Sequence, residues 1–118
     1  MIFEAPMLLR CDGKPFATIV RYGYETPWAN GELRADDPGE FDRFDRAGAL
    51  ARWSREQAEL LADDEYDAGY EREQARLGLT DDDARHCESA AWTIVTADGE
   101  EHQAYSLDFL DGWIQWRW

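Results

Sequence analysis

Residue types that bind metals crowd one short stretch of the sequence. Three aspartates, Asp81, Asp82 and Asp83, are followed closely by His86 and Cys87. On a helix Asp82 and His86 form an i, i+4 pair, a spacing that can place two ligands on one ion. No second cluster of Cys and His accompanies them, and the carboxylates are consecutive where a calcium loop alternates its ligands. The stretch therefore predicts a capped, solvent-exposed helix start, with no metal site and no cofactor.

Nucleophilic catalysis requires a Ser or Cys beside a base that a third group orients. The candidates are Cys11, Cys87 and three serines, with His86 and His102 as bases. None lies at a strand-to-helix nucleophile elbow, and on a helix Cys87 would point about 100° away from His86. The 26 acidic residues form so many carboxylate pairs that none is singled out for acid–base work. We therefore predict that the protein is not an enzyme; scattered carboxylates acting with a histidine are the catalytic alternative.

The sequence carries a formal net charge of −14, with 26 acidic residues against 12 Lys and Arg. This charge repels phosphates and anionic head groups, so direct binding to nucleic acid or to a membrane surface is not expected. Residues 36–88 hold 17 acidic and 7 basic residues, and the rest of the chain holds 9 and 5. Opposite charges steer association, so a basic protein surface is the favoured partner. The alternative is an acidic surface that serves only solubility.

The segment "DDEYDAGYERE" concentrates this charge on one face of a predicted helix. Asp63, Asp67 and Glu71 form an i, i+4 column of like charges, which costs a helix about 0.2–0.5 kcal/mol per pair. Helix stability alone does not favour such a column. Tyr66 and Tyr70 add rigid aromatic area of the kind enriched at interfaces. The predicted partner-binding residues are Asp63, Asp64, Tyr66, Asp67, Tyr70 and Glu71, with Asp81, Asp82 and Asp83 as a flanking patch.

These features favour an inhibitor: an immunity protein for a toxic nuclease, or an anti-CRISPR-like antagonist of a nucleic-acid-binding complex. Carboxylates at i, i+4 rise about 6 Å apart along a helix, whereas phosphates of one DNA strand are about 3.4 Å apart. Mimicry of nucleic acid would therefore need more helices, loops or a homodimer. The alternative is a small accessory or scaffold domain that assembles through aromatic strand and loop surfaces. Tyr24, Trp28 and Trp113 are predicted to form this secondary aromatic surface.

The N-terminal and central segments contain clear signals for strands and helices. Two β-rich runs, 3–10 and 16–24, flank the turn dipeptide Asp12-Gly13, and Asn30-Gly31 suggests another turn before a short strand over 32–35. Asp37 and Pro38 begin a helix. The apolar phase flips near Gly48, which predicts a break there. A further helix spans about 64–78, and Thr80 caps the next one with Asp83.

The C-terminal segment from residue 90 reads as three β-rich runs separated by Asp-Gly turns at 98–99 and 111–112. In its last run, alternation places Ile114, Trp116 and Trp118 on the core face and Trp113 on the other. The predicted fold is a single α+β domain over residues 1–118: an antiparallel sheet, made of an N-terminal hairpin and a C-terminal three-stranded meander, with three to four short helices packed on one face. Two cysteines and no apolar spanning segment suggest a cytoplasmic protein with free thiols, a Cys11–Cys87 bridge being the alternative.

Overall fold

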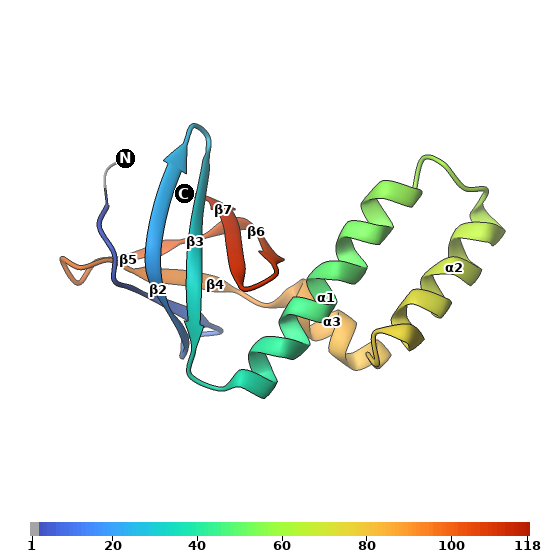
Figure 1. Ribbon diagram of the computed structural model, residues 1–118, viewed down its shortest axis with the longest axis horizontal. Helices are drawn as coiled ribbons and strands as arrows, with labels where there is room; N and C mark the ends of the chain where they lie inside the picture. Colours follow the sequence, from blue (N-terminus) through green and yellow to red (C-terminus); the bar gives the residue numbers. More distant parts are fainter. Residues whose placement is uncertain (1–2) are drawn as a thin grey trace.

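The structure is a computed structural model that describes residues 3–118. Its elements are, in chain order, β1 (Met7–Cys11), β2 (Lys14–Glu25), β3 (Trp28–Ala35), α1 (Pro38–Gln57), α2 (Asp63–Arg76), α3 (Asp81–Ser89), β4 (Trp92–Val95), β5 (Glu101–Gln103), β6 (Tyr105–Leu110) and β7 (Trp113–Arg117). Figure 1 shows the strands gathered at one end of the molecule and the helices at the other. The mixed α and antiparallel β class is as predicted.

All seven strands form one antiparallel sheet, in the order β5-β4-β1-β2-β3-β7-β6. The two outermost strands, β5 and β6, are separated in the chain only by Ala104, so the sheet curls round until its edges become chain neighbours. The predicted three-stranded meander is wrong. Its middle run divides at Ala104, which is buried; β4 and β5 pair beside β1, and β6 and β7 pair beside β3.

The core fills the curled sheet and continues under the first helix. Leu9, Ile19, Ile94, Ile114 and Trp116 are each 0% exposed, which confirms the predicted core positions of Ile114 and Trp116. Trp118, predicted on the same face, is half-buried and lies one residue beyond the end of β7. The rings of Phe16, Phe44, Trp92 and Phe109 meet edge to face or stacked at centroid distances of 5.1–6.0 Å. Phe44 belongs to α1, so this aromatic cluster joins the helices to the sheet.

One predicted N-terminal turn is confirmed and the other is wrong. Asp12 and Gly13 have φ of 51° and 79°, as a tight hairpin turn requires. Asn30 and Gly31 lie inside β3, which is longer than predicted, and the chain turns earlier, at Thr26-Pro27. A Cβ atom on Gly31 would lie 2.7 Å from the Ile19 side chain. Close packing, not a turn, explains the glycine.

The central segment forms three helices, and the predicted break at Gly48 is absent. Asp37 caps α1 by accepting hydrogen bonds from the Gly39 and Glu40 amides, and Pro38 begins the helix as predicted. The helix then runs on for 20 residues. Its apolar face rotates because its first half covers the sheet, through Phe44, and its second half covers α2, through Trp53.

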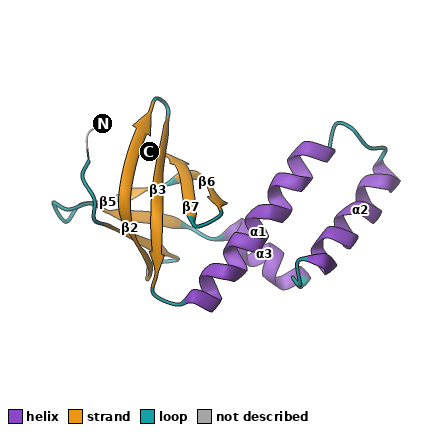
Figure 2. Cartoon of the chain, in the orientation of Figure 1, coloured by secondary structure: helices purple, strands orange, loops and turns teal. Residues whose placement is uncertain are grey.

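The helices do not all pack on one face of the sheet, which corrects the predicted arrangement. α1 lies against β6 and α3, while α2 packs mainly on α1 and projects away from the strands (Figure 2). Gly69 of α2 allows this, since a Cβ there would lie 2.8 Å from the Trp53 ring. The molecule is elongated, 49 × 30 × 20 Å, with a radius of gyration of 15.2 Å against about 13.5 Å for a compact chain of this length.

Within residues 3–118, none of the helices combines the length and the apolar character needed to span a membrane.

Candidate partner-binding groove

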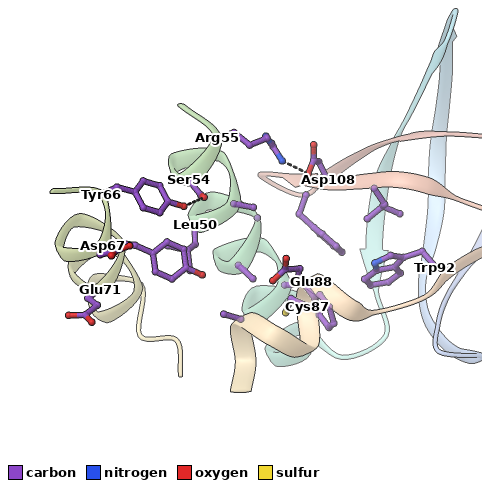
Figure 3. A pocket seen from close by; sticks show the side chains of 18 residues that line it. Leu50, Ser54, Arg55, Tyr66, Asp67, Glu71, Cys87, Glu88, Trp92 and Asp108 are labelled. Atoms are coloured by element: carbon purple, nitrogen blue, oxygen red, sulfur yellow. Dashed lines mark hydrogen bonds and ion pairs between the residues drawn. The ribbon is translucent and has the colours of Figure 1, made fainter. Parts of the chain in front are cut away.

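A groove of about 750 Å³ lies between α2 and the sheet, alongside α1. Its walls come from α1, α2 and α3 on one side and from β4 and β6 on the other (Figure 3). α2 packs on α1 through Gly69 and Trp53 and projects away from the strands (Figure 2), which leaves this hollow between α2 and the sheet. Its volume lies within the range of about 300–1,000 Å³ usual for ligand pockets.

The floor of the groove is apolar. Leu50 of α1 is 3% exposed, and Trp92 and Phe109 from the sheet are also buried. Gly48 brings α1 close to β6, because a Cβ there would lie 2.9 Å from the Phe109 carbonyl oxygen. The floor is therefore part of the hydrophobic core, and its position is fixed by the packing that holds the helices to the sheet.

Two tyrosines of α2 form an aromatic wall. The Tyr66 ring lies 5.7 Å from Trp53 and 6.2 Å from Tyr70, and its hydroxyl is hydrogen-bonded to the Ser54 hydroxyl. Both tyrosines are half-buried. Burial raises the pKa of Tyr70, and the nearby Glu88 carboxylate raises it further. The wall thus presents fixed ring faces and a phenol that stays protonated at neutral pH.

Four carboxylates stand around this apolar centre: Asp67 and Glu71 of α2, Glu88 of α3 and Asp108 of β6. Asp108 forms an ion pair with Arg55 at 3.2 Å. Among the described residues, the other three have no ion-pair partner within 4.0 Å. The groove therefore carries an excess of negative charge next to aromatic rings, which suits a cationic occupant with an apolar stem.

The structure divides the residues predicted on α2 between two places. Tyr66, Asp67, Tyr70 and Glu71 line the groove, as Figure 3 shows for those that it labels. Asp63 and Asp64 do not. Asp64 borders a separate, smaller hollow with Arg72, and Asp63 stands exposed at the start of the helix.

The three aspartates predicted as a flanking patch form hydrogen bonds or ion pairs with neighbouring residues of the same chain. Asp83 accepts a hydrogen bond from the Thr80 amide, while Thr80 accepts one from the Asp83 amide, so the predicted capping box is confirmed. These bonds, with Arg43 at 3.3 Å, hold the pKa of Asp83 below its usual range. Asp81 accepts a bond from Gln74 at 2.8 Å, and Asp82 pairs with Arg85 at 2.5 Å.

The three aromatic residues predicted as a secondary surface lie apart. Tyr24 pairs with the buried Ala29 in the β2–β3 register, so it belongs to the inner face of the sheet. Trp28 of β3 and Trp113 of β7 both lie on the outer face, at opposite ends of the β3–β7 pairing. Arg117, four residues after Trp113 on β7, places its guanidinium 5.7 Å from the centre of the Trp28 ring. Trp113 is 38% exposed.

Sequence reasoning missed the side of the groove that the sheet contributes. Trp92 and Asp108 come from strands whose positions depend on pairings across the whole chain. Glu88 could have been considered from the sequence, because it lies on the same short predicted helix as the acidic residues 81–83. Nothing in the sequence placed it opposite α2.

The two cysteines are free thiols, both half-buried. Burial raises the pKa of Cys11 to about 12 and that of Cys87 to about 11, with nearby carboxylates adding to both shifts. Neither is therefore an activated nucleophile at neutral pH. Cys11 does stand close to two other ligand-type side chains, Asp12 and His86, with the ligand atoms of all three within 4.8 Å of one another.

No family model, curated protein or solved structure matches this chain.

Proposed function

We propose that this protein is a non-catalytic, cytoplasmic inhibitor or immunity-type protein, which binds the basic, nucleic-acid-binding surface of a protein partner through its acidic groove. One observation supports this most strongly. Asp67, Glu71 and Glu88 have no ion-pair partners among the described residues and stand beside the half-buried rings of Tyr66 and Tyr70. A cationic side chain of a partner would supply the pairing that these three carboxylates lack.

Both parts of a Lys or Arg side chain of the partner, the aliphatic stem and the charged head, find matching surfaces in the groove. The aliphatic stem can lie on the apolar floor near Leu50 and Phe109, while the charged head meets the carboxylates. Tyrosine faces add attraction for a cation within about 6 Å of the ring centre. The preferred occupant is therefore a protruding basic segment, and the exposed acids of α2 outside the groove would steer its approach.

The groove also suggests how the carboxylates of this protein could take the place of nucleic-acid phosphates on a partner. A single column on α2 is too sparse to reproduce phosphate spacing. Carboxylates on α2, α3 and β6 surround one hollow instead. This arrangement supports competition between the protein and a nucleic acid for the same basic residues of the partner. It does not require the carboxylates to reproduce the spacing of a nucleic-acid backbone.

The proposal is tested with two triple variants of equal net charge. The groove variant carries Asp67→Lys, Glu71→Lys and Glu88→Lys; the sheet variant carries Glu4→Lys, Glu25→Lys and Glu100→Lys at exposed positions. Each reversal adds two positive charges, so both variants change from −14 to −8. Proteins are captured from lysate of the native host on each, and the affinity of a captured partner is then measured by calorimetry.

We expect the groove variant to lose a basic partner that the sheet variant retains. Binding should also weaken steeply at about 0.5 M salt, where screening acts within a few ångströms. Equal loss in both variants would show that only net charge matters. A partner that persists at high salt and binds the groove variant would instead favour assembly through aromatic surfaces.

A further inference from the structure

The turn between β1 and β2 and the middle of α3 bring three different metal-binding side chains together. Cys11 ends β1, Asp12 follows in the turn, and His86 projects from α3, far away in the sequence. One ligand atom from each lies within 4.8 Å of the others. We propose that Cys11, Asp12 and His86 form a zinc site, with water completing the coordination.

The donor set favours zinc over other common ions. A thiolate sulfur and an imidazole nitrogen suit a borderline-soft ion, whereas calcium and magnesium take oxygen ligands. Tetrahedral zinc with bonds of about 2.0–2.3 Å places its donors roughly 3.3–3.8 Å apart. The donor atoms would therefore have to close by about 1.5 Å at most. Rotation of the exposed His86 side chain towards Cys11 and Asp12 can provide this movement.

The backbone around Asp12 holds its carboxylate towards the cluster. Its Oδ1 accepts a hydrogen bond from the Ala91 amide at 2.9 Å, and its own amide donates to the Ala91 carbonyl at 2.8 Å. These two bonds tie the hairpin turn to the residues just beyond α3. Its other oxygen, Oδ2, lies 3.9 Å from the Cys11 sulfur. Such supporting contacts orient ligands in metal sites.

The exposed His86 ring lies against the edge of the core. It lies 5.7 Å from the ring of Phe44, the buried aromatic residue that joins α1 to the sheet. On binding, zinc would lose water molecules and gain bonds to the Cys11 sulfur, a His86 nitrogen and an Asp12 oxygen, and the thiol proton would pass to solvent. The ion would then cross-link the β1–β2 turn to α3, the helix that also carries Glu88.

Cys87 provides a matched control. It is the neighbour of His86 in the sequence and is also half-buried, but it is not among the three side chains that meet. Exchanging Cys87 for Ser should leave the site intact, whereas Cys11→Ser removes its only sulfur ligand. The two variants separate zinc binding by the cluster from general binding by any thiol or from a bridge between the two cysteines.

The test uses full-length protein free of an affinity tag, titrated with Zn²⁺ by calorimetry and with Co²⁺ by absorption. We expect one bound ion, a thiolate-to-cobalt charge-transfer band and a higher melting temperature that chelation reverses. Cys11→Ser and His86→Ala should weaken binding by more than the ~10- to 100-fold that loss of a supporting contact costs. Cys87→Ser should bind as the wild type does.

A second measurement needs no substitution. Wild-type protein is alkylated with and without Zn²⁺, and mass spectrometry follows each cysteine separately. Zinc should slow the modification of Cys11 and leave Cys87 nearly unchanged. The site is rejected if micromolar Zn²⁺ does not bind, if both thiols are protected alike, or if Cys87→Ser weakens binding as much as Cys11→Ser.

Discussion

Gly48 is a residue whose role depends on a strand that lies far away in the sequence. In the sequence, a glycine at the point where the apolar residues move to another face of the helix indicates a helix break. In the structure α1 passes through it, and the space for its missing Cβ is taken by the Phe109 carbonyl. That oxygen belongs to the backbone of β6 and also accepts a hydrogen bond from Arg52. It cannot move aside unless the strand moves.

Gly48→Ala should therefore destabilise the protein. Overpacking of this kind costs about 1–3 kcal/mol, which exceeds the gain of at most about 1 kcal/mol that alanine brings over glycine in a helix. Urea denaturation measures the change in the free energy of unfolding. The control is Gly39→Ala in the first turn of α1, where the nearest atom is 3.4 Å away, and no loss is expected there. A Gly48→Ala variant as stable as wild type would contradict the close approach of α1 to β6.

The tryptophans of β7 show what sequence can predict about single residues. Alternation along a strand is local, so it correctly placed Trp116 in the core, at 0% exposure, and Trp113 outside, at 38%. Trp118 is half-buried and donates a hydrogen bond to the Tyr22 hydroxyl at 2.9 Å. That last contact links residues 96 positions apart, and no local pattern could predict it.

At the scale of elements, α3 is a short helix held at its start by Asp83. The pKa of Asp83 is lowered in the folded protein by hydrogen bonds from Thr80 and by Arg43. Its carboxylate therefore stabilises the fold at pH values above its ordinary pKa of 3.8, and this contribution is lost as the pH falls through the lower folded-state value. Asp83→Ala should reduce stability at neutral pH.

The stability difference between wild type and Asp83→Ala should be constant from pH 7 to about 5 and should shrink below about pH 4. Urea midpoints measured across this range check it. Asp82→Ala is the neighbouring control, because the Asp82 side chain is 90% exposed and, within residues 3–118, forms an ion pair only with Arg85. It should change stability little at any pH. A pH-independent loss in Asp83→Ala would mean that its charge plays no part.

Caps and one hairpin turn were predictable because their signals lie within four residues of each other. Asp37, the Asp12-Gly13 turn and the capping box at Thr80 are all of this kind. Strand order was not predictable, because the last four strands divide between two edges of the N-terminal sheet: β4 and β5 beside β1, and β6 and β7 beside β3. The groove depends on that order. The residue pattern therefore singled out four residues of α2 that line the groove, as members of a binding face, and missed the side made by Trp92 and Asp108.

At the scale of the whole molecule, charge and shape act together. α2 holds six acidic and two basic residues and is the helix that projects furthest from the sheet. Negative charge is thus carried on an arm of an elongated molecule, the position from which, under the proposed function, it would attract a basic partner. Within α2 itself, like-charge repulsion in the column formed by Asp63, Asp67 and Glu71 still lowers the stability of the helix.

A single reversal at the centre of this column should separate stability from binding. Asp67→Lys turns two repulsive i, i+4 pairs into attractive ones, so it should raise the free energy of unfolding by about 1 kcal/mol at low salt. It should also weaken binding of a basic partner. Glu4→Lys, at an exposed position before β1, changes the net charge by the same amount, and its smaller gain measures the relief of general repulsion. The advantage of Asp67→Lys should fade at about 0.5 M salt. If both variants gain equally, the column carries no special strain, and its charges are explained by solubility alone.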